Sequence, residues 1–250
     1  MGLLYDVQDL TKSYGKLRVL DRLTFGVERR ECLVIMGRSG CGKSVTLRLL
    51  NGLEQPDSGR ILFDGDDIAG LSETALYPVR RRVAMLFQSG ALFDSMNVLE
   101  NIAFPLREHT DLEDDAVAAK VAEKLAVVRL AGIEEKMPSD LSGGMRKRVA
   151  LARSLALDPE VVLFDEPTSG LDPVTSATIA ELILGARETH GVTSVVVTHD
   201  VPLARRVGDR VAFLENGGFR FIGTWTEADA SDDPVFRAFL SGQSEAADAA

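Results

Sequence analysis

The sequence is poor in the residues that build disulfides, membrane spans and secretory signals. Only two of its 250 residues are cysteines, Cys32 and Cys41, so we expect no disulfide framework and a reducing compartment. No apolar run approaches the roughly 18 residues that a spanning helix needs. The first ten residues lack a basic start and a long apolar stretch, so we expect no secretory signal and a cytoplasmic location.

Positive charge is also scarce. The chain has 28 Lys and Arg against 38 Asp and Glu, a formal net charge of −10. A duplex-binding surface needs a positive field, so we expect no nucleic-acid partner. The basic runs RRR at residues 80–82 and RKR at residues 146–148 are interpreted as solvated helix faces, with a partner surface as the alternative.

The order of apolar patterns predicts an α/β fold. Short runs such as VVLFDE and VTSVVVTHD are nearly continuous in apolar residues, which is typical of parallel strands buried on both faces. RVAFLENGGFRFIG predicts a hairpin that turns at residues 216–218. The segment from about residue 98 to 157 has helical spacing. We therefore expect an α/β core with a helical lobe inserted in the middle.

GRSGCGKS, residues 37–44, fits the pattern G-x-x-x-x-G-K-[ST] and lies between a predicted strand and a predicted helix. Glycines let the loop turn its N–H groups onto phosphate, and the helix N-terminus adds a favourable dipole. Lys43 is expected to reach the β- and γ-phosphates, and the Ser44 hydroxyl to bind Mg²⁺. Cys41 is interpreted as a small side chain that fits the loop rather than a functional thiol. The predicted nucleotide contacts here are Gly37, Arg38, Ser39, Gly40, Cys41, Gly42, Lys43, Ser44 and Val45.

Two acidic residues end the predicted strand VVLFDE. A carboxylate in this place, next to a phosphate loop, can hold Mg²⁺, and we assign that role to Asp165. Glu166 is then placed to polarise an attacking water, as the general base. The alternative, solvated loop charge, is disfavoured because the glycine-rich loop is also present.

The segment LSGGMRKRVALARSLALDPEVVLFDEPTSGLDP, residues 141–173, resembles the signature-to-Walker-B segment of ABC-transporter ATPases. Ser142 is a good N-cap, and Gly143 and Gly144 allow close approach of phosphate. The resemblance implies ATP bound between two copies, with Gly40 and Lys43 of one facing Ser142 and Gly144 of the other. Met145 stands where many members carry glutamine, a position with no expected role in the chemistry.

The resemblance assigns further roles residue by residue. Tyr14 resembles the aromatic residue that stacks on adenine, with a packed strand-end tyrosine as the alternative. Gln88 resembles the Q-loop glutamine that senses Mg²⁺ and water, and Asp172 holds the D-loop position. His199 resembles the switch histidine that contacts the γ-phosphate. The implied cofactors are ATP and Mg²⁺, the latter held by Ser44, Gln88 and Asp165.

The resemblance also implies a domain plan. A P-loop NTPase (RecA-like) core with an N-terminal antiparallel β subdomain would occupy residues 1–88 and 159–225. A helical subdomain with the signature motif would occupy residues 89–158. A C-terminal helix and flexible tail would occupy residues 226–250.

The stretch QSGALFDSMNVLENIAFPLREHT, residues 88–110, is mostly apolar. In ABC transporters the residues after the Q-loop line a groove for helices of the membrane subunits, and exposed apolar patches commonly mark such sites. We therefore expect Leu92 and Phe93 to face a partner. For Val98, Ile102 and Phe104 we favour the alternative, burial in the core of the helical lobe.

The sequences of this stretch and of the signature segment closely resemble the corresponding sequences of the ATPases of Mce/Mla-type phospholipid transporters. That resemblance implies an ATPase homodimer on the cytoplasmic side of the inner membrane, under an MlaE-like permease and together with an Mce-domain lipid-binding protein. The lipid substrate rests on this resemblance alone. The alternative is an ABC ATPase of an importer for another small substrate. A non-transport ABC protein, a P-loop kinase and a GTPase are disfavoured because the chain has one cassette with its own signature segment.

Overall fold

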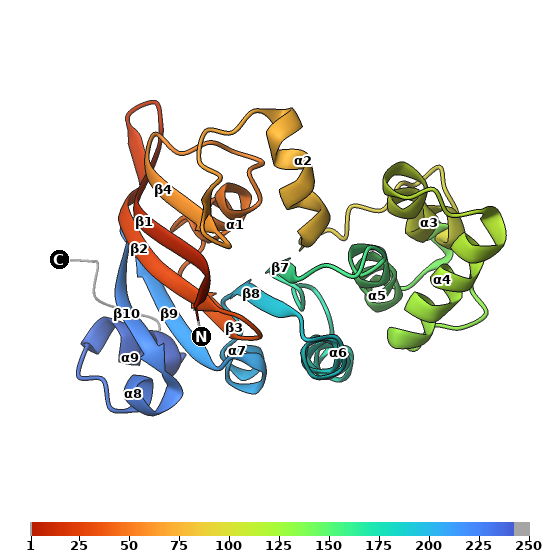
Figure 1. Cartoon of the computed structure of the whole chain (residues 1–250). Helices are drawn as coiled ribbons and strands as arrows, with labels where there is room; N and C mark the ends of the chain where they lie inside the picture. Colours follow the sequence, from red (N-terminus) through yellow and green to blue (C-terminus); the bar gives the residue numbers. More distant parts are fainter. Residues whose placement is uncertain (1, 243–250) are drawn as a thin grey trace. The chain divides into compact units, whose positions relative to one another are not determined.

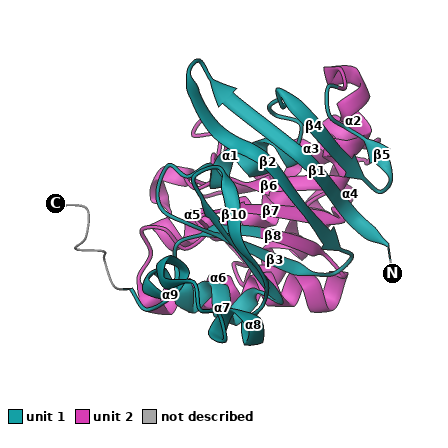
Figure 2. Ribbon diagram, turned by 90° about the vertical axis from the view of Figure 1, so that its left-hand side faces the viewer, with its two compact units in different colours: residues 1–70, 196–250 teal, residues 71–195 magenta. Residues whose placement is uncertain are grey.

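The computed structural model describes residues 2–242 of the chain. It forms two compact units, one of residues 1–70 with 196–250 and one of residues 71–195 (Figures 1 and 2). The chain returns to the first unit within strand β8 (Thr193–Thr198). The fold is mixed α/β, as expected, whereas the subdomain boundaries given above stay predictions. The predicted flexible tail falls from residue 243 onward outside the described residues.

The first unit holds most of the strands. Its elements besides the end of β8 are β1 (Leu3–Tyr14), β2 (Leu17–Glu28), β3 (Cys32–Met36), α1 (Lys43–Leu50), β4 (Ser58–Phe63), β5 (Asp66–Asp67), α7 (Val201–Val207), β9 (Arg210–Glu215), β10 (Gly218–Thr224), α8 (Trp225–Asp229) and α9 (Pro234–Leu240).

An antiparallel sheet with the order β2-β1-β4-β5 forms one part of this unit. It holds helix α1 through Tyr5 of β1, whose buried hydroxyl donates to the Leu50 carbonyl at 3.1 Å. The Tyr5 ring also packs on Phe63 of β4, with 5.0 Å between the ring centroids. The end of α1 is thus fixed to the sheet, which positions the loop that precedes the helix.

Strand β3 is buried along its whole length, which is typical of a parallel strand covered on both faces. It pairs in parallel with β9, and β9 pairs antiparallel with β10. Asn216 and Gly217 both have positive φ, at 49° and 81°, so the turn predicted between β9 and β10 is confirmed.

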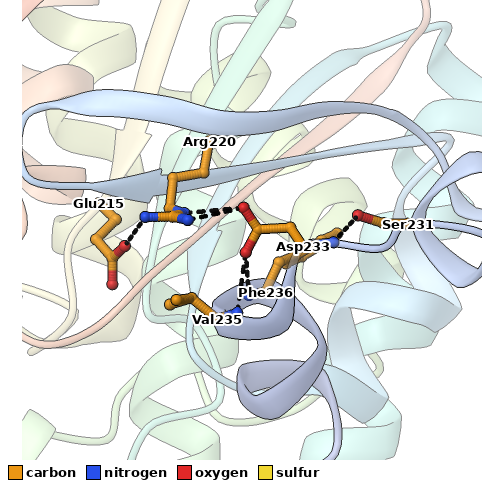
Figure 3. Close-up of polar contacts among 6 residues, drawn as sticks. All are labelled: Glu215, Arg220, Ser231, Asp233, Val235 and Phe236. Atoms are coloured by element: carbon orange, nitrogen blue, oxygen red, sulfur yellow. Dashed lines mark hydrogen bonds and ion pairs between the residues drawn. The ribbon is translucent and has the colours of Figure 1, made fainter.

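Helix α9, the last element of the described chain, is bonded to this hairpin (Figure 3). Arg220 of β10 donates to Glu215 of β9 at 3.1 Å and to Asp233 at 2.9 Å. Asp233 is also the N-cap of α9, because its Oδ1 accepts from the N–H groups of Val235 and Phe236, both at 2.9 Å. Below this polar network Phe236 is fully buried. One carboxylate thus starts α9 and ties it to the strands.

The second unit is mainly helical. Its elements besides the start of β8 are α2 (Glu73–Arg82), β6 (Val83–Leu86), α3 (Val98–His109), α4 (Asp114–Val127), the 3₁₀ turn η1 (Pro138–Asp140), α5 (Gly143–Ser154), β7 (Val161–Asp165) and α6 (Pro173–His190).

Helices α3, α4 and α5 pack against one another in this unit (Figure 1). Helix α3 begins with a capping box formed by Asn97 and Glu100. Its buried residues Val98, Ile102 and Leu106 recur every four positions, so one stripe of the helix faces its neighbours. Strand β7 is fully buried and pairs in parallel with β6.

Candidate functional site

The glycine-rich loop connects β3 to α1 in the first unit. Gly37 is tightly enclosed, since a Cβ there would lie 2.4 Å from the Leu214 carbonyl oxygen and 2.6 Å from Cys41 Sγ. Gly42 is the N-cap of α1 with a φ of 110°, a conformation that glycine adopts readily. A glycine cap carries no side-chain acceptor. The first N–H groups of the helix can therefore donate to a bound anion.

Lys43 is the first residue of α1, and its side chain lies over the loop. Its Nζ donates to the carbonyls of Gly37 and Arg38 at 2.8 and 3.0 Å. An ammonium held within the curl of the loop is suited to a phosphate ligand, since charge-assisted bonds to phosphate are strong. The other loop residues differ in exposure: Arg38, Ser39 and Gly40 are exposed, Cys41 and Ser44 are half-buried, and Val45 is buried.

The Cys41 thiol shows no sign of activation. Burial raises the pKa of Cys41, and the nearby Lys43 ammonium offsets only part of this effect. The thiolate is the reactive form of cysteine, so a raised pKa supports the interpretation of Cys41 as a small packing residue.

Tyr14 lies at the end of β1 and is 44% exposed. Its hydroxyl donates to Glu54, which is also bonded by Arg48 of α1. Burial and the hydrogen bond to Glu54 raise the pKa of Tyr14. The ring is therefore anchored next to α1 while almost half of the residue stays accessible. An anchored, accessible ring can stack on a flat base, and the choice between that role and a packed strand-end tyrosine stays a prediction.

The acidic pair lies in the second unit, where β7 ends. Asp165 and Glu166 are both buried, with exposures of 8% and 9%. Glu166 has a φ of +46°, which is uncommon for a residue with a side chain and costs about 1–2 kcal/mol. The backbone of the predicted general base is thus held in a strained conformation.

The signature segment and the D-loop meet within the second unit. Ser142 is the N-cap of α5, accepting from the Met145 N–H at 3.2 Å, as predicted. Asp172 is the N-cap of α6 and also accepts from the Thr175 hydroxyl at 2.6 Å. A Cβ at Gly144 would lie 2.4 Å from Thr175 Cγ2. Packing within the chain therefore favours glycine at position 144, and its role in phosphate access stays a prediction.

Gln88 joins the same region. It is exposed, and its Nε2 donates to the Ser169 hydroxyl at 3.2 Å, three residues beyond Glu166. His199 follows β8 and belongs to the first unit, where it is exposed. Asp200 next to it caps α7 by accepting from the Leu203 N–H at 3.1 Å.

The candidate residues are thus divided between the two units. Within the first unit the structure links Tyr14 to α1, whose N-terminus carries the glycine-rich loop; His199 also belongs to this unit. Within the second unit it links Gln88 to the turn after Glu166, and the signature glycines to the D-loop. Their assigned roles stay predictions.

One residue of this region was missed by sequence reasoning. Lys147 of α5 is only 7% exposed, and its Nζ donates to the carbonyls of Ser169 and Glu166 at 2.7 and 3.3 Å. The interpretation of residues 146–148 as a solvated helix face is therefore wrong for Lys147. Position 147 lies three and four residues before the buried Ala150 and Leu151, a spacing that could have revealed its inward direction.

The apolar stretch after Gln88 divides into core and surface. Val98 and Ile102 are fully buried, as expected. Phe104 is 38% exposed and Phe93 41% exposed, so the expectation that Phe104 is a core residue is wrong. Phe104 is two residues after Ile102 on α3, which turns it away from the buried stripe. Leu92 is half-buried.

Two polar side chains hold this surface from below. Asn101 is fully buried and binds the Phe93 backbone in both directions, accepting from its N–H at 2.8 Å and donating to its carbonyl at 3.1 Å. Arg153 of α5 donates to the carbonyls of Gly90 and Ala91 at 3.1 and 2.8 Å. Its guanidinium also lies 5.6 Å from the Phe93 ring centroid. The exposed phenylalanine is therefore part of an ordered surface.

The family model described as ABC transporter matches residues 20–169, which include the glycine-rich loop, Gln88, Ser142 and Glu166. The chain belongs to the ABC transporter family. As a member of this family of ATP-binding proteins, the ABC ATPase binds ATP and hydrolyses it. In the described part of the ABC ATPase, no helix combines the length and the apolar character needed to cross a membrane.

Curated relatives of the ABC ATPase cover nearly its whole length. It is 44% identical over 239 residues to the "Intermembrane phospholipid transport system ATP-binding protein MlaF" of Escherichia coli, covering 96% of this chain and 89% of the relative. It is 45% identical over 243 residues to the "Probable ribonucleotide transport ATP-binding protein mkl" of Mycobacterium leprae, covering 97% and 70%.

A solved structure agrees with the fold. A dimeric ATP-binding cassette in a post-hydrolysis state, bound to ADP and Pi, is 31% identical with a TM-score of 0.82, covering 88% of this chain and 98% of that chain.

Proposed function

We propose that this ABC ATPase is the motor subunit of a transporter that moves phospholipid between the inner membrane and the outer envelope. The observation that carries the proposal is the 44% identity to MlaF of Escherichia coli over 96% of this chain. The phospholipid substrate comes from the name of that relative. The exposed pair Phe93 and Phe104 supports a protein partner, which a motor needs to transmit its movement.

The proposed roles follow the chemistry of each side chain. The loop of residues 37–45 holds the phosphates, with Lys43 as the main cation, and Tyr14 stacks on the base. Glu166 is the general base for the attacking water, Gln88 orients that water, and His199 contacts the γ-phosphate. Each role uses a group of the required chemical type, and the residue assigned as general base is buried, with an exposure of 9%.

Mg²⁺ is the proposed metal cofactor, and Ser44, Gln88 and Asp165 are the residues that would hold it. A hydroxyl, an amide oxygen and a carboxylate form the hard oxygen set that Mg²⁺ prefers. Gln88 would offer its Oε1 to the metal, because its Nε2 donates to Ser169. The metal supplies charge that neutralises the phosphates when ATP is bound.

A homodimer with ATP between two copies is proposed. The N-cap Ser142 and Gly143 are exposed at the start of α5, where helix N–H groups can receive a γ-phosphate from a second copy. Asp172 at the start of α6 is exposed as well. The dimeric cassette with ADP and Pi supports this arrangement by its likeness to the chain.

The proposed partners are an MlaE-like permease, docked at Leu92 and Phe93, and an Mce-domain lipid-binding protein in the same complex. The ABC ATPase would then be a peripheral protein on the cytoplasmic side of the inner membrane. Nucleic acid is not proposed as a partner, since the net charge is −10.

The alternative is an ABC ATPase of an importer for another small substrate. Its support is the word ribonucleotide in the name of the Mycobacterium leprae relative. The motor chemistry is the same in both cases, so only the substrate and the permease distinguish them.

A purification of the tagged chain in mild detergent tests the proposal. The ATPase rates of the purified wild type and Glu166→Gln are compared, since loss of the base should slow hydrolysis by about 10²–10⁴-fold while ATP still binds.

Mass spectrometry of the purified wild-type complex should identify a permease, an Mce-domain protein and phospholipid. A different permease with a soluble binding protein would favour the alternative, and normal turnover of Glu166→Gln would contradict the assigned base.

A further inference from the structure

We propose that Lys147 of α5 is a positioning residue for ATP hydrolysis, which holds the backbone of the predicted base and couples the signature helix to it. The proposal deepens the proposed function, because it rests on the role of Glu166 given above. Its basis is geometric. The Lys147 ammonium bonds the carbonyl of Glu166 at 3.3 Å and that of Ser169 at 2.7 Å, which are the two ends of the turn after β7.

The turn between these carbonyls begins with an uncommon backbone conformation. Glu166 has a φ of +46°, so its backbone is in a region that side-chain-bearing residues seldom occupy. The Ser169 N–H also donates to the Glu166 carbonyl at 3.1 Å. Lys147 therefore adds a second donor to the same oxygen and closes the turn from the other side at Ser169. Strained conformations persist where surrounding contacts over-determine them.

The position of the lysine is itself unusual. It is 7% exposed, and a buried cation is unfavourable unless its donors are satisfied. Burial lowers the pKa of Lys147, although the Glu166 carboxylate acts in the opposite direction. A buried leucine or methionine would fill this space without the desolvation cost of a cation. The carbonyl contacts are what a lysine provides there, since its ammonium carries three donors on a flexible stem.

Ser169 extends the connection to the Q-loop. Its carbonyl accepts from Lys147, and its hydroxyl accepts from Gln88 Nε2 at 3.2 Å. The signature helix and the Q-loop thus hold the same serine by two different atoms. A displacement of either Gln88 or α5 is expected to shift the turn, and with it the direction of Glu166.

The test compares Lys147→Met, Lys147→Gln and the matched control Lys124→Met. Lys124 is another buried lysine on a helix of the same unit, bonded to Asp158 at 2.5 Å. For each purified protein, kcat and KM for ATP, the Kd of a fluorescent ATP analogue and the Tm are measured. We expect Lys147→Met to lower kcat by about 10–100-fold, as small misplacements of catalytic groups do, with an unchanged Kd. Lys147→Gln keeps an N–H donor and should recover part of the lost rate.

The control separates positioning from stability. Lys124→Met should lower the Tm and leave kcat unchanged. The proposal is overturned if Lys147→Met turns over like the wild type, or if Lys124→Met loses as much kcat. Should Lys147→Met fail to fold, Lys147→Gln decides alone: its kcat should lie below that of the wild type, and a wild-type kcat with intact nucleotide binding would overturn the proposal. Glu166→Gln separates failure of the proposed function from failure of the positioning role. Normal ATP turnover of Glu166→Gln would refute the assigned base. Arrested turnover of Glu166→Gln together with normal turnover of Lys147→Met would refute the positioning role alone.

Discussion

The rings of Phe93 and Phe104 lie with their centroids 5.0 Å apart at an interplanar angle of 58°, and both remain exposed. Tilted aromatic pairs of this kind stabilise each other. Arg153 lies over the Phe93 ring, and Asn101 holds the Phe93 backbone. An ordered, exposed apolar pair is typical of the centre of a protein interface.

Polar substitution of this pair should separate the motor from its partner. The double variant Phe93→Ser and Phe104→Ser should lose co-purification with the permease and keep its own ATPase rate, since neither ring is a core residue. The matched control is Ile102→Ser on the same helix, which is fully buried and should cost about 2–5 kcal/mol of stability. Early melting of the double variant would instead show that the pair serves the stability of the fold rather than a partner.

Removal of the Lys43 side chain should weaken nucleotide binding. Hydrogen bonds to charged groups contribute about 1.5–3 kcal/mol, so Lys43→Ala should raise the Kd for ATP about 10–100-fold. A binding titration with a fluorescent ATP analogue measures this, and Lys136→Ala, at an exposed lysine, is the control for the lost charge. Equal affinities of Lys43→Ala and the wild type would count against the phosphate site.

A methyl group at position 144 should clash with one atom, Thr175 Cγ2. Gly144→Ala places a Cβ 2.4 Å from Thr175 Cγ2, so we expect a lower Tm and a lower ATPase rate. Thr175→Ser removes that methyl group and keeps the hydroxyl that bonds Asp172. The double variant Gly144→Ala with Thr175→Ser should therefore recover its Tm. If it recovers stability without ATPase activity, Gly144 is also needed for approach to phosphate.

The Asp158 carboxylate should stabilise the fold above about pH 4. Burial alone would raise the pKa of Asp158, but its bonds to Lys120 and Lys124 hold it below the ordinary value. The folded state therefore ionises at lower pH than the unfolded chain, whose aspartates titrate near pH 4. The stabilisation is complete above that value and is lost as the pH falls through the lowered pKa of the folded state.

Asp158→Asn tests this prediction. Asparagine tolerates the φ of +51° at this position, so the variant isolates the charge. Because the Asp158 side chain is 54% exposed, we expect a loss of about 1–2 kcal/mol at neutral pH, less than for a fully buried pair. Urea unfolding at pH 7 and at pH 3 should show this difference shrinking in acid. Asp111→Asn, at an exposed carboxylate, should show neither effect.

Local patterns were sufficient for much of the fold and of the candidate site. The glycine-rich loop, the cap Ser142 and the hairpin at Asn216 each depend on a few neighbouring residues, so the sequence predicts them directly. Buried strands such as β3 and β7 follow from apolar runs alone.

Long-range packing decided what the sequence could not predict. Phe104 and Ile102 are equally apolar, and only the phase of α3 against its neighbours places one outside and the other inside. Lys147 stands in a basic run, yet its helix turns it toward carbonyls 19 and 22 residues away. Buried Asn101 gives no signal in a pattern of apolar residues, because its partners are backbone groups.

With Glu166 in the proposed role of general base, its left-handed backbone would set fold stability and activity against each other at one position. Glycine accepts a φ of +46° without strain, so Glu166→Gly should relieve part of the conformational cost while removing the carboxylate. Selection for heat resistance alone would then favour a catalytically silent chain. Directed evolution of a more thermostable variant would therefore need a measurement of ATP turnover at every round, since the first increases in Tm could come from replacement of Glu166.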